Sequence, residues 1–149
     1  MKGLIDIHKI IKNIMLEIVI NLFIDKDLDG NSIAKDVDKL IIGVFSSHPS
    51  NLPWTEFARA KRSRNNLYRI LGAIIDRERQ SDSDEPTLIR TLLKNNTNKN
   101  ISFTNNEISD QINAFLFAGY DNSSSMAAWS IVHLATNRSV YEKLHQEVV

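Results

Sequence analysis

The run Ala118-Gly-Tyr-Asp-Asn-Ser123 interrupts an apolar helical pattern with small and polar residues that could do chemistry. Gly119 inside a helix costs about 1 kcal/mol relative to alanine, so a packing or functional need must offset it. At about 100° per residue, a groove of small side chains leads to an acid and an amide on one side of this helix: Ala114, Ala118, Asp121, Asn122 and Ser125. A close helix–helix crossing at Gly119, with serine hydroxyls bonded to the preceding turn, would explain the same residues. Both interpretations stay open at this point.

A second candidate site is the acidic stretch Asp25-x-Asp27-x-Asp29-Gly30-x5-Asp36, whose spacing is close to that of a calcium-binding EF-hand loop. Asp36 replaces the usual bidentate glutamate, Ser32 takes a position that is normally apolar, and the sequence has no second loop to pair with this one. The favoured interpretation is therefore an acidic, solvated turn between two helices. An independent helical protein with a calcium loop at 25–36 is the alternative.

The other polar clusters give weaker signals. The four histidines, at positions 8, 48, 133 and 145, lack the spacing of metal ligands, so no metal site is expected. The basic stretch Arg59-Ala-Lys-Arg-Ser-Arg64 is compatible with contact to a membrane surface, but a solvated helix face is the favoured interpretation.

Composition excludes several classes of function. The chain has 149 residues, with 18 Lys and Arg, 18 Asp and Glu, and no cysteine. Zero net charge argues against nucleic acid as a partner, because phosphate binding needs concentrated positive charge. The lack of cysteine removes disulfides, thiol nucleophiles and zinc–thiolate sites. The longest apolar run, Ile18–Ile24, is too short to span a bilayer and no signal peptide is visible, so we expect no transmembrane segment and a cytoplasmic location.

The elements that must position these residues are helices. Apolar residues recur at helical spacing along most of the chain without an alternating strand pattern, which predicts an all-α fold. The first helix is predicted over 4–23, and one stripe of it is apolar: Ile7, Ile11, Ile14, Ile18 and Leu22. Asn31 or Ser32 is expected to cap a second helix that ends near Phe45. A loop follows at 46–53, where two prolines interrupt the pattern.

Thr55 is predicted to cap a third helix that ends near Gln80 and buries a narrow stripe: Leu67, Ile70, Leu71, Ile74 and Ile75. A polar linker at 81–85 precedes a short helix, which begins at Pro86, ends near Lys94 and is followed by an Asn-rich loop at 95–100.

Two capping boxes organise the remainder. Thr104-Asn-Asn-Glu107 begins a long helix predicted to reach Asn137, and Ser139-Val-Tyr-Glu142 begins a final helix. The chain is thus one domain in four parts: helices over 1–80, a linker and short helix over 81–104, a long central helix over 105–137, and the start of a further helix over 139–149.

The run Ala118-Gly119-Tyr-Asp-Asn-Ser, preceded by Asp110–Phe117 and followed by Leu134-Ala-Thr-Asn137, resembles the long central helix of cytochromes P450, where the pattern is Ala/Gly-Gly-x-Asp/Glu-Thr-Thr/Ser. The segment Asn51-Leu-Pro-Trp-Thr-x-Phe-x-Arg-Ala60 is similar to the loop and helix after the substrate-access region of cyanobacterial and retinoid-hydroxylating members. Gly43–Phe45 fits the helix before it, and Tyr141–Leu144 fits the helix after the central one. The resemblance covers nearly the whole chain in the family's order.

The resemblance implies a haem cofactor in the full-length enzymes, with dioxygen held in the groove at Ala118 and Gly119. Asp121 matches the acid that relays solvent protons. Asn122 stands where the family usually has threonine, and its amide can donate a hydrogen bond but cannot alternate between donor and acceptor as a hydroxyl does. Ala114 and Phe117 match positions that face an apolar substrate. An electron-donor protein, a reductase or a ferredoxin, is implied as a partner.

One part of the family pattern is absent. The family's haem ligand is a cysteine in a Phe-x-x-Gly-x-x-x-Cys loop downstream of the central helix, and this chain has no cysteine. Glu56-Phe-Ala-Arg59 spells the family's Glu-x-x-Arg pair, but far upstream of its usual place, which indicates coincidence. The final helix reaches Val149 without a stop signal, which is typical of truncation. We therefore expect a partial cytochrome P450 fold without a complete haem site, a middle fragment of a haem-thiolate monooxygenase. Its parent would hydroxylate an apolar substrate with dioxygen and two electrons, whereas this chain alone is expected to bind haem weakly or not at all and to be inactive.

Overall fold

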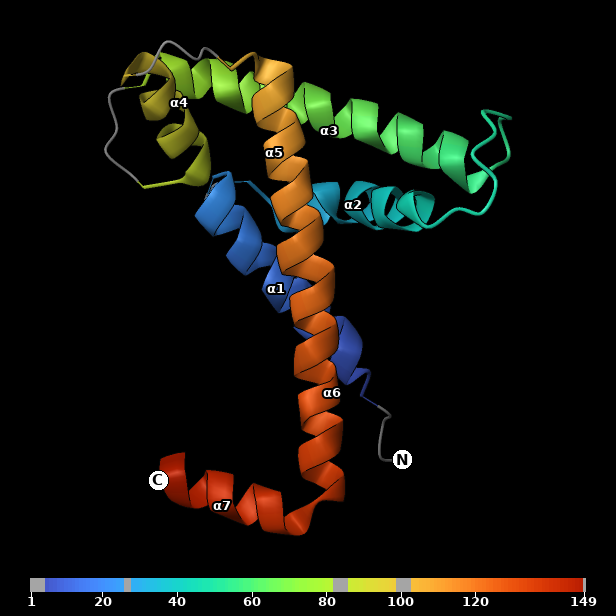
Figure 1. Cartoon of the computed structure of the whole chain (residues 1–149), viewed down its shortest axis with the longest axis vertical. Coiled ribbons are helices and arrows are strands. Elements are labelled where there is room, and N and C mark those ends of the chain that lie inside the picture. The colour runs from blue at the N-terminus through green and yellow to red at the C-terminus, as the bar shows by residue number, and fades with distance from the viewer. Residues whose placement is uncertain (1–4, 26–27, 82–85, 99–102, 149) are drawn as a thin grey trace.

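The computed structural model describes residues 5–25, 28–81, 86–98 and 103–148 (Figure 1). Within those ranges the ordered elements are helices joined by turns and loops, so the predicted all-α class is confirmed. They are, in chain order, α1 (Ile7–Phe23), α2 (Gly30–Val44), α3 (Glu56–Arg79), α4 (Leu88–Asn98), α5 (Asn105–Phe117), the π-helical turn η1 (Ala118–Asn122), α6 (Ser123–Thr136) and α7 (Arg138–Val148).

A single helical column formed by α5, η1 and α6 runs the length of the molecule (Figure 1). Its start is fixed by the predicted capping box: Thr104 Oγ1 accepts from the Glu107 amide at 3.3 Å, and the Glu107 carboxylate accepts from the Thr104 amide at 2.8 Å. The column ends at Thr136, with Asn137 as its C-cap. The helix predicted over 105–137 is therefore present, but a π-helical turn divides it.

The roof over this column is the antiparallel pair α2 and α3, which packs more extensively than other helix pairs in the described part of the chain (Figure 1). Thr55 caps α3 as predicted, because its hydroxyl accepts from the Ala58 amide at 3.2 Å. The cap of α2 is Asp29, whose carboxylate accepts from the Asn31 amide at 3.0 Å, so the prediction of Asn31 or Ser32 as the cap is wrong. The helix therefore starts at Gly30, two residues before the start that an Asn31 cap would give.

The core lies where α1, α2, α3, α4 and α5 meet. Its fully buried side chains are Ile20, Ile24, Ile33, Val37, Leu67, Leu71, Ile75, Ile89, Ile108, Ile112 and Leu116. The predicted stripe on α3 is buried here, with Ile70 partly buried beside it. On α1 the buried face is Leu16, Val19 and Ile20, whereas most of the apolar stripe noted in the sequence is exposed: Ile7, Ile14, Ile18 and Leu22.

Other boundaries also differ from the sequence predictions: α4 begins at Leu88 and not at Pro86. The short helix α4 continues to Asn98, so residues 95–98 are helical where a loop was predicted, and 99–100 lie outside the described residues. The final helix α7 begins at Arg138, and the Asn137 carbonyl accepts from the amides of Val140 and Tyr141. Ser139 therefore lies inside the first turn and is not an N-cap, and Glu142 instead accepts from Arg138 Nε at 2.8 Å.

A buried ion pair joins α4 to α3, with 2.5 Å between Arg90 Nη2 and Glu78 Oε2 and each side chain 10% exposed. Within the described ranges, none of the helices combines the length and the apolar character that crossing a bilayer requires.

Candidate functional site

The π-helical turn η1 is the local irregularity of the column, and it comprises the Ala118–Asn122 run singled out in the sequence. Such turns insert one extra residue per turn and are frequent at functional sites. The hydroxyl of Ser124, which is fully buried, donates to the carbonyls of this turn, at 2.7 Å from Tyr120 O and 3.0 Å from Asp121 O. The hydroxyl-to-preceding-turn bond expected from the sequence is thus present at Ser124.

Gly119 allows α1 to approach the column closely. A Cβ atom on Gly119 would lie 3.1 Å from Val19 Cγ2 and 3.6 Å from Phe23 Cε2. Val19 is buried and β-branched, so it has little freedom to move away. The helix-crossing interpretation of Gly119 is therefore supported, and the same glycine sits within the turn that carries the polar residues.

Three predicted site residues share one open face of the column. Ala114, Ala118 and Asn122, at successive intervals of four residues, are all exposed. Phe117 lies half-buried beside them, and its ring packs against Phe45 at the end of α2 with 6.0 Å between centroids. This face, bounded by small side chains and an aromatic pair, is an apolar surface with one amide at its end. We name it the open face.

Asp121 departs from the arrangement expected from the sequence, because it turns toward α1. Its Oδ1 lies 3.5 Å from Lys12 Nζ, and its side chain is 31% exposed. Lys12 Nζ also donates to Asp38 Oδ1 at 3.0 Å, and the Tyr120 hydroxyl donates to the same oxygen at 3.1 Å. The Lys12 ammonium lies 4.9 Å from the centroid of the Tyr120 ring. We name Lys12, Asp38, Tyr120 and Asp121 the acid cluster.

The acid cluster shifts two pKa values upward. Burial raises the pKa of the Tyr120 hydroxyl, and the neighbouring Asp38 carboxylate raises it further against the opposing effect of Lys12. Burial lowers the pKa of Lys12, but its hydrogen bond to Asp38 and the charge of that carboxylate outweigh burial, so the pKa of Lys12 lies above its ordinary value. Lys12 therefore remains a cation between the two carboxylates at neutral pH.

Sequence reasoning missed Lys12, Asp38 and Tyr120 as members of the site, and it missed Phe45. Asp38 lies 26 residues from Lys12 and 82 from Tyr120, so no local spacing connects them. Lys12 stands four residues before the buried Leu16, so the helical repeat places it on the same face of α1, but its partner could not have been named.

The described carboxylates of the acidic stretch considered for calcium are engaged in contacts within the protein. Asp25 forms an ion pair with Arg77, Asp29 caps α2, and Asp36 accepts from Ser63 Oγ at 2.8 Å and Asn66 Nδ2 at 2.5 Å. Asp27 lies outside the described residues. Among the residues described, His, Asp and Glu form no group of three or more that could hold a metal ion.

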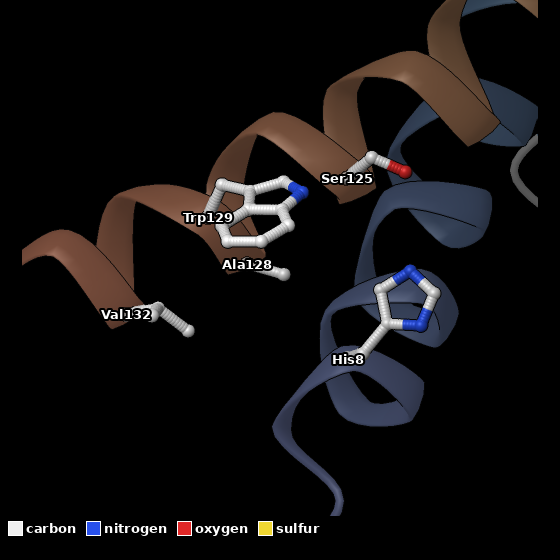
Figure 2. Close-up of a pocket in the computed structure, with 5 residues that line it drawn as sticks. All are labelled: His8, Ser125, Ala128, Trp129 and Val132. Carbon is white, nitrogen blue, oxygen red and sulfur yellow. The ribbon is translucent and has the colours of Figure 1, made fainter.

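A separate open hollow of about 360 Å³ lies between α1 and α6 (Figure 2). Figure 2 shows Ser125 and Trp129 of α6 above His8 of α1, with Ala128 and Val132 completing the lining. Ser125, which the sequence grouped with the site, thus faces this hollow. One imidazole and one hydroxyl on an open surface give it no evident catalytic arrangement.

The fold and the open face define a class of protein. A long helical column, interrupted by a π-helical turn with small residues on its open side and roofed by an antiparallel helix pair, is the helical fold of haem-thiolate oxygenases. The chain belongs to the cytochrome P450 family, because the family's sequence profile, Cytochrome P450, matches residues 1–149.

Individual relatives agree with this assignment. The chain is 28% identical over 137 residues to (1S)-1-hydroxy-luvungin A synthase CYP88A37 of Citrus sinensis, covering 88% of the chain and 28% of that protein. It is 32% identical to abscisic acid 8'-hydroxylase CYP707A1 of Solanum lycopersicum, covering 70% of the chain and 23% of that protein. Retinoic acid-bound cyanobacterial CYP120A1 superposes with a TM-score of 0.85 at 25% identity, covering 94% of this chain and 32% of that one. The chain spans less than a third of the length of these relatives.

The family implies a haem cofactor. The residues present could line the oxygen-binding side of a haem, but they do not supply the ligand on its other side. The exposed small side chains of the open face leave room for a flat group, whereas the 149 residues include no cysteine to serve as its thiolate ligand. Glu56 and Arg59, which spell the family's Glu-x-x-Arg pair, are both exposed at the start of α3, in agreement with a coincidental match. The donor set of this chain therefore does not fit a complete haem site.

Proposed function

We propose that this chain supplies the pocket roof and the oxygen-side helix of a haem-thiolate monooxygenase, which hydroxylates an apolar substrate with dioxygen and two electrons from an electron-donor protein. The observation that carries the proposal is the π-helical turn, because it continues the exposed face of Ala114 with Ala118 and Asn122, while the acid of the same turn, Asp121, is paired with Lys12 of α1. In the full-length enzymes of the family, the haem supplies the redox chemistry.

The apolar part of the open face is proposed to contact substrate. Ala114 and Phe117 lie one turn apart, and Phe45 extends the surface from the roof helix α2. Small residues at Ala118 and Gly119 keep the adjoining part of the face free of bulky side chains. Binding of an apolar substrate to this surface is favourable, because it removes water both from the substrate and from the aromatic and methyl groups of the open face.

The polar end of the face is proposed to deliver protons. The Asp121 carboxylate is 31% exposed, so it can take a proton from solvent and pass it to a water on the side of Asn122. The Asn122 amide can hold that water by donating or accepting a hydrogen bond, but its donor and acceptor are fixed on different atoms. Lys12 Nζ, 3.5 Å from Asp121 Oδ1, holds this carboxylate beside α1.

Activity of this chain alone is expected to be absent, since it contains no thiolate ligand. The test is reconstitution of the purified chain with haemin, followed by reduction and exposure to carbon monoxide. The expected result is no Soret band of the thiolate-ligated type. Appearance of that band would contradict this part of the proposal, because the band requires a thiolate.

The residue roles can be tested in a chimera in which this chain replaces the matching third of cyanobacterial CYP120A1. We expect Asn122→Thr to increase the product formed per electron consumed, because a hydroxyl can both accept and donate in the proton path. Asp121→Asn is expected to slow turnover and to increase the solvent isotope effect. Ser123→Thr is the matched control. Equal effects of the changes at positions 122 and 123 would contradict the role given to Asn122.

A further inference from the structure

A pocket of about 300 Å³ lies between the two roof helices α2 and α3, and we name it the roof pocket. Apolar side chains and one glycine make up most of its lining: Leu40, Gly43, Val44, Phe57 and Ala60. The other two lining residues are cations, Lys61 and Arg64, and both are exposed. An apolar hollow with a few polar groups at one edge is typical of a site that orients a small organic ligand.

The roof pocket adjoins the open face of the column. Arg64 Nη2, at its edge, lies 3.0 Å from Asp110 Oδ1 of α5. Phe45, which follows the pocket residues of α2 in the chain, packs against Phe117 with 6.0 Å between ring centroids. Asp110, Ala114 and Phe117 are spaced by four and three residues, so they share one face of α5. The two contacts therefore hold the roof against that face on either side of Ala114.

The positive charge of the roof pocket is only partly balanced. In the described part of the chain, no ion pair joins Lys61 to an acidic side chain. Arg64 donates to Asp110 Oδ1 at 3.0 Å and to the Tyr68 hydroxyl at 2.5 Å, and both bonds use Nη2. The N–H groups on its Nη1 and Nε can therefore donate to a further acceptor. Two cations beside one carboxylate leave a single positive charge, which matches a ligand with one negative charge.

We propose that the roof pocket holds the carboxylate end of the substrate, a monocarboxylic acid whose apolar body extends onto the open face. The inference rests on the function proposed above and narrows the substrate class from apolar compounds in general to apolar acids. Lys61 and Arg64 are then specificity-determining residues, because a carboxylate accepts from both and the planar guanidinium suits its geometry. A neutral apolar molecule gains nothing from either cation.

The size of the roof pocket agrees with a ligand that continues beyond it. A volume of about 300 Å³ is at the small end of ligand pockets, so it can enclose the charged end of a longer acid but not the whole molecule. The adjoining apolar surface at Ala114 and Phe117 is where the remainder of the ligand can be buried. The acid is thereby oriented, with its charged end under the roof and its hydrocarbon end on the column.

The experiment measures the binding of dodecanoate and of 1-dodecanol, which have the same hydrocarbon chain, to the purified protein by titration calorimetry. Each exposed ion pair contributes up to about fivefold in affinity, so dodecanoate should bind roughly tenfold more tightly than dodecanol. This preference should decline as ionic strength rises, because the pairs are exposed. Equal affinity for the two ligands would overturn the inference and leave the apolar surface of the proposed function in place. Absence of binding by either ligand would overturn both.

The charge requirement is tested with Lys61→Gln, which removes an exposed cation and leaves the pair of Arg64 and Asp110 in place. We expect roughly fivefold weaker binding of dodecanoate and unchanged binding of dodecanol. Lys39→Gln is the matched control, because it removes the same charge from a separate groove of the same helix pair, and it should change binding by less than about twofold. Equal losses in the two variants would overturn the proposal.

The path of the hydrocarbon chain is tested with Ala114→Trp, which fills part of the open face with a bulky side chain. We expect this variant to lose binding of both dodecanoate and dodecanol. Ser130→Trp, at an exposed position of α6, is the matched control and should retain both. Unchanged binding of dodecanoate in Ala114→Trp would overturn the placement of the ligand on the open face. Circular dichroism of each variant verifies that the helices are retained.

Discussion

The ammonium of Lys12 lies between two carboxylates, 3.0 Å from Asp38 Oδ1 on the roof helix α2 and 3.5 Å from Asp121 Oδ1 in the π-helical turn. The acid proposed to relay protons and the roof of the proposed pocket are thereby connected through one side chain of α1. Tyr120 adds a second connection, because its hydroxyl donates to the same oxygen of Asp38 at 3.1 Å. Any movement of α2 relative to the column must therefore change the contacts of the acid cluster.

Lys12→Met should destabilise the chain by about 1–2 kcal/mol, because it leaves two neighbouring carboxylates without their cation in a partly buried site. The urea midpoint followed by circular dichroism measures this change. Lys9→Met, three residues earlier on the same helix and exposed, is the control, and it should change stability by less than about 0.5 kcal/mol. A similar loss in both variants would show that the acid cluster contributes nothing specific.

Stability should fall at alkaline pH because of Tyr120 and Lys12. Their ordinary pKa values are 10.0 and 10.5, and the fold raises both. Well below pH 10 both groups are protonated in the folded and unfolded chain, so their contribution is fully present. As the pH rises through the folded pKa values, the unfolded chain has already released protons that the folded chain still binds, and the free energy of unfolding decreases. The thermal midpoint measured against pH should therefore decline more steeply above pH 10 in the wild-type chain than in Tyr120→Phe.

Two glycines in helices should respond in opposite directions to alanine. A Cβ atom on Gly43 would lie 2.0 Å from Ala60 Cβ, so Gly43→Ala must separate α2 from α3 and should destabilise the chain by about 2–3 kcal/mol. Gly72 has no atom within 4 Å of such a Cβ, so Gly72→Ala should stabilise it by about 0.5–1 kcal/mol through helix propensity. Urea unfolding of the two variants compares them directly. Destabilisation by Gly72→Ala would show that α3 is packed differently from the structure.

The chain should self-associate through α6 and bind apolar dyes. Met126 is 69% exposed and Trp129 is 71% exposed, and α7 buries none of its described residues. Leaving such side chains in water forfeits about 1.5–3 kcal/mol each, so pairing them between chains is favourable. Analytical ultracentrifugation over a range of concentrations should show association that Trp129→Glu reduces and Gln111→Glu, on an exposed position of α5, does not. A monomer at all concentrations, with no dye binding, would contradict this prediction.

Calcium should leave the chain unaffected at concentrations below roughly 1 mM, which is the weak end of the EF-hand range. The reason is that these carboxylates already have partners in the protein. Asp25 is paired with Arg77, Asp29 caps α2, and Asp36 accepts a hydrogen bond from Ser63 of α3. Titration calorimetry measures the binding. Micromolar affinity that disappears in Asp25→Ala would favour the calcium-loop alternative.

The sequence by itself determined the helices and their local signals. The apolar periodicity predicted the all-α class, and the caps at Thr55 and Thr104 were predictable because an N-cap depends on residues within one turn. Gly119 and the polar run after it marked the π-helical turn as a place of unusual composition. These features are local, so no knowledge of distant residues was needed.

Tertiary structure decided which way the side chains face and which partners they meet. The apolar stripe of α1 is mostly exposed, because the buried face of that helix is Leu16, Val19 and Ile20, with Val19 against Gly119 of the column and Leu16 and Ile20 near Gly30 of α2. Asp121 faces Lys12 of α1, and Asp38 accepts a hydrogen bond from Tyr120 across 82 residues of sequence. Periodicity can show that a helix has an apolar face, but its partner depends on how separate helices cross. That crossing is fixed by close approaches such as Gly119 against Val19 and Gly43 against Ala60, which exist only once the chain has folded.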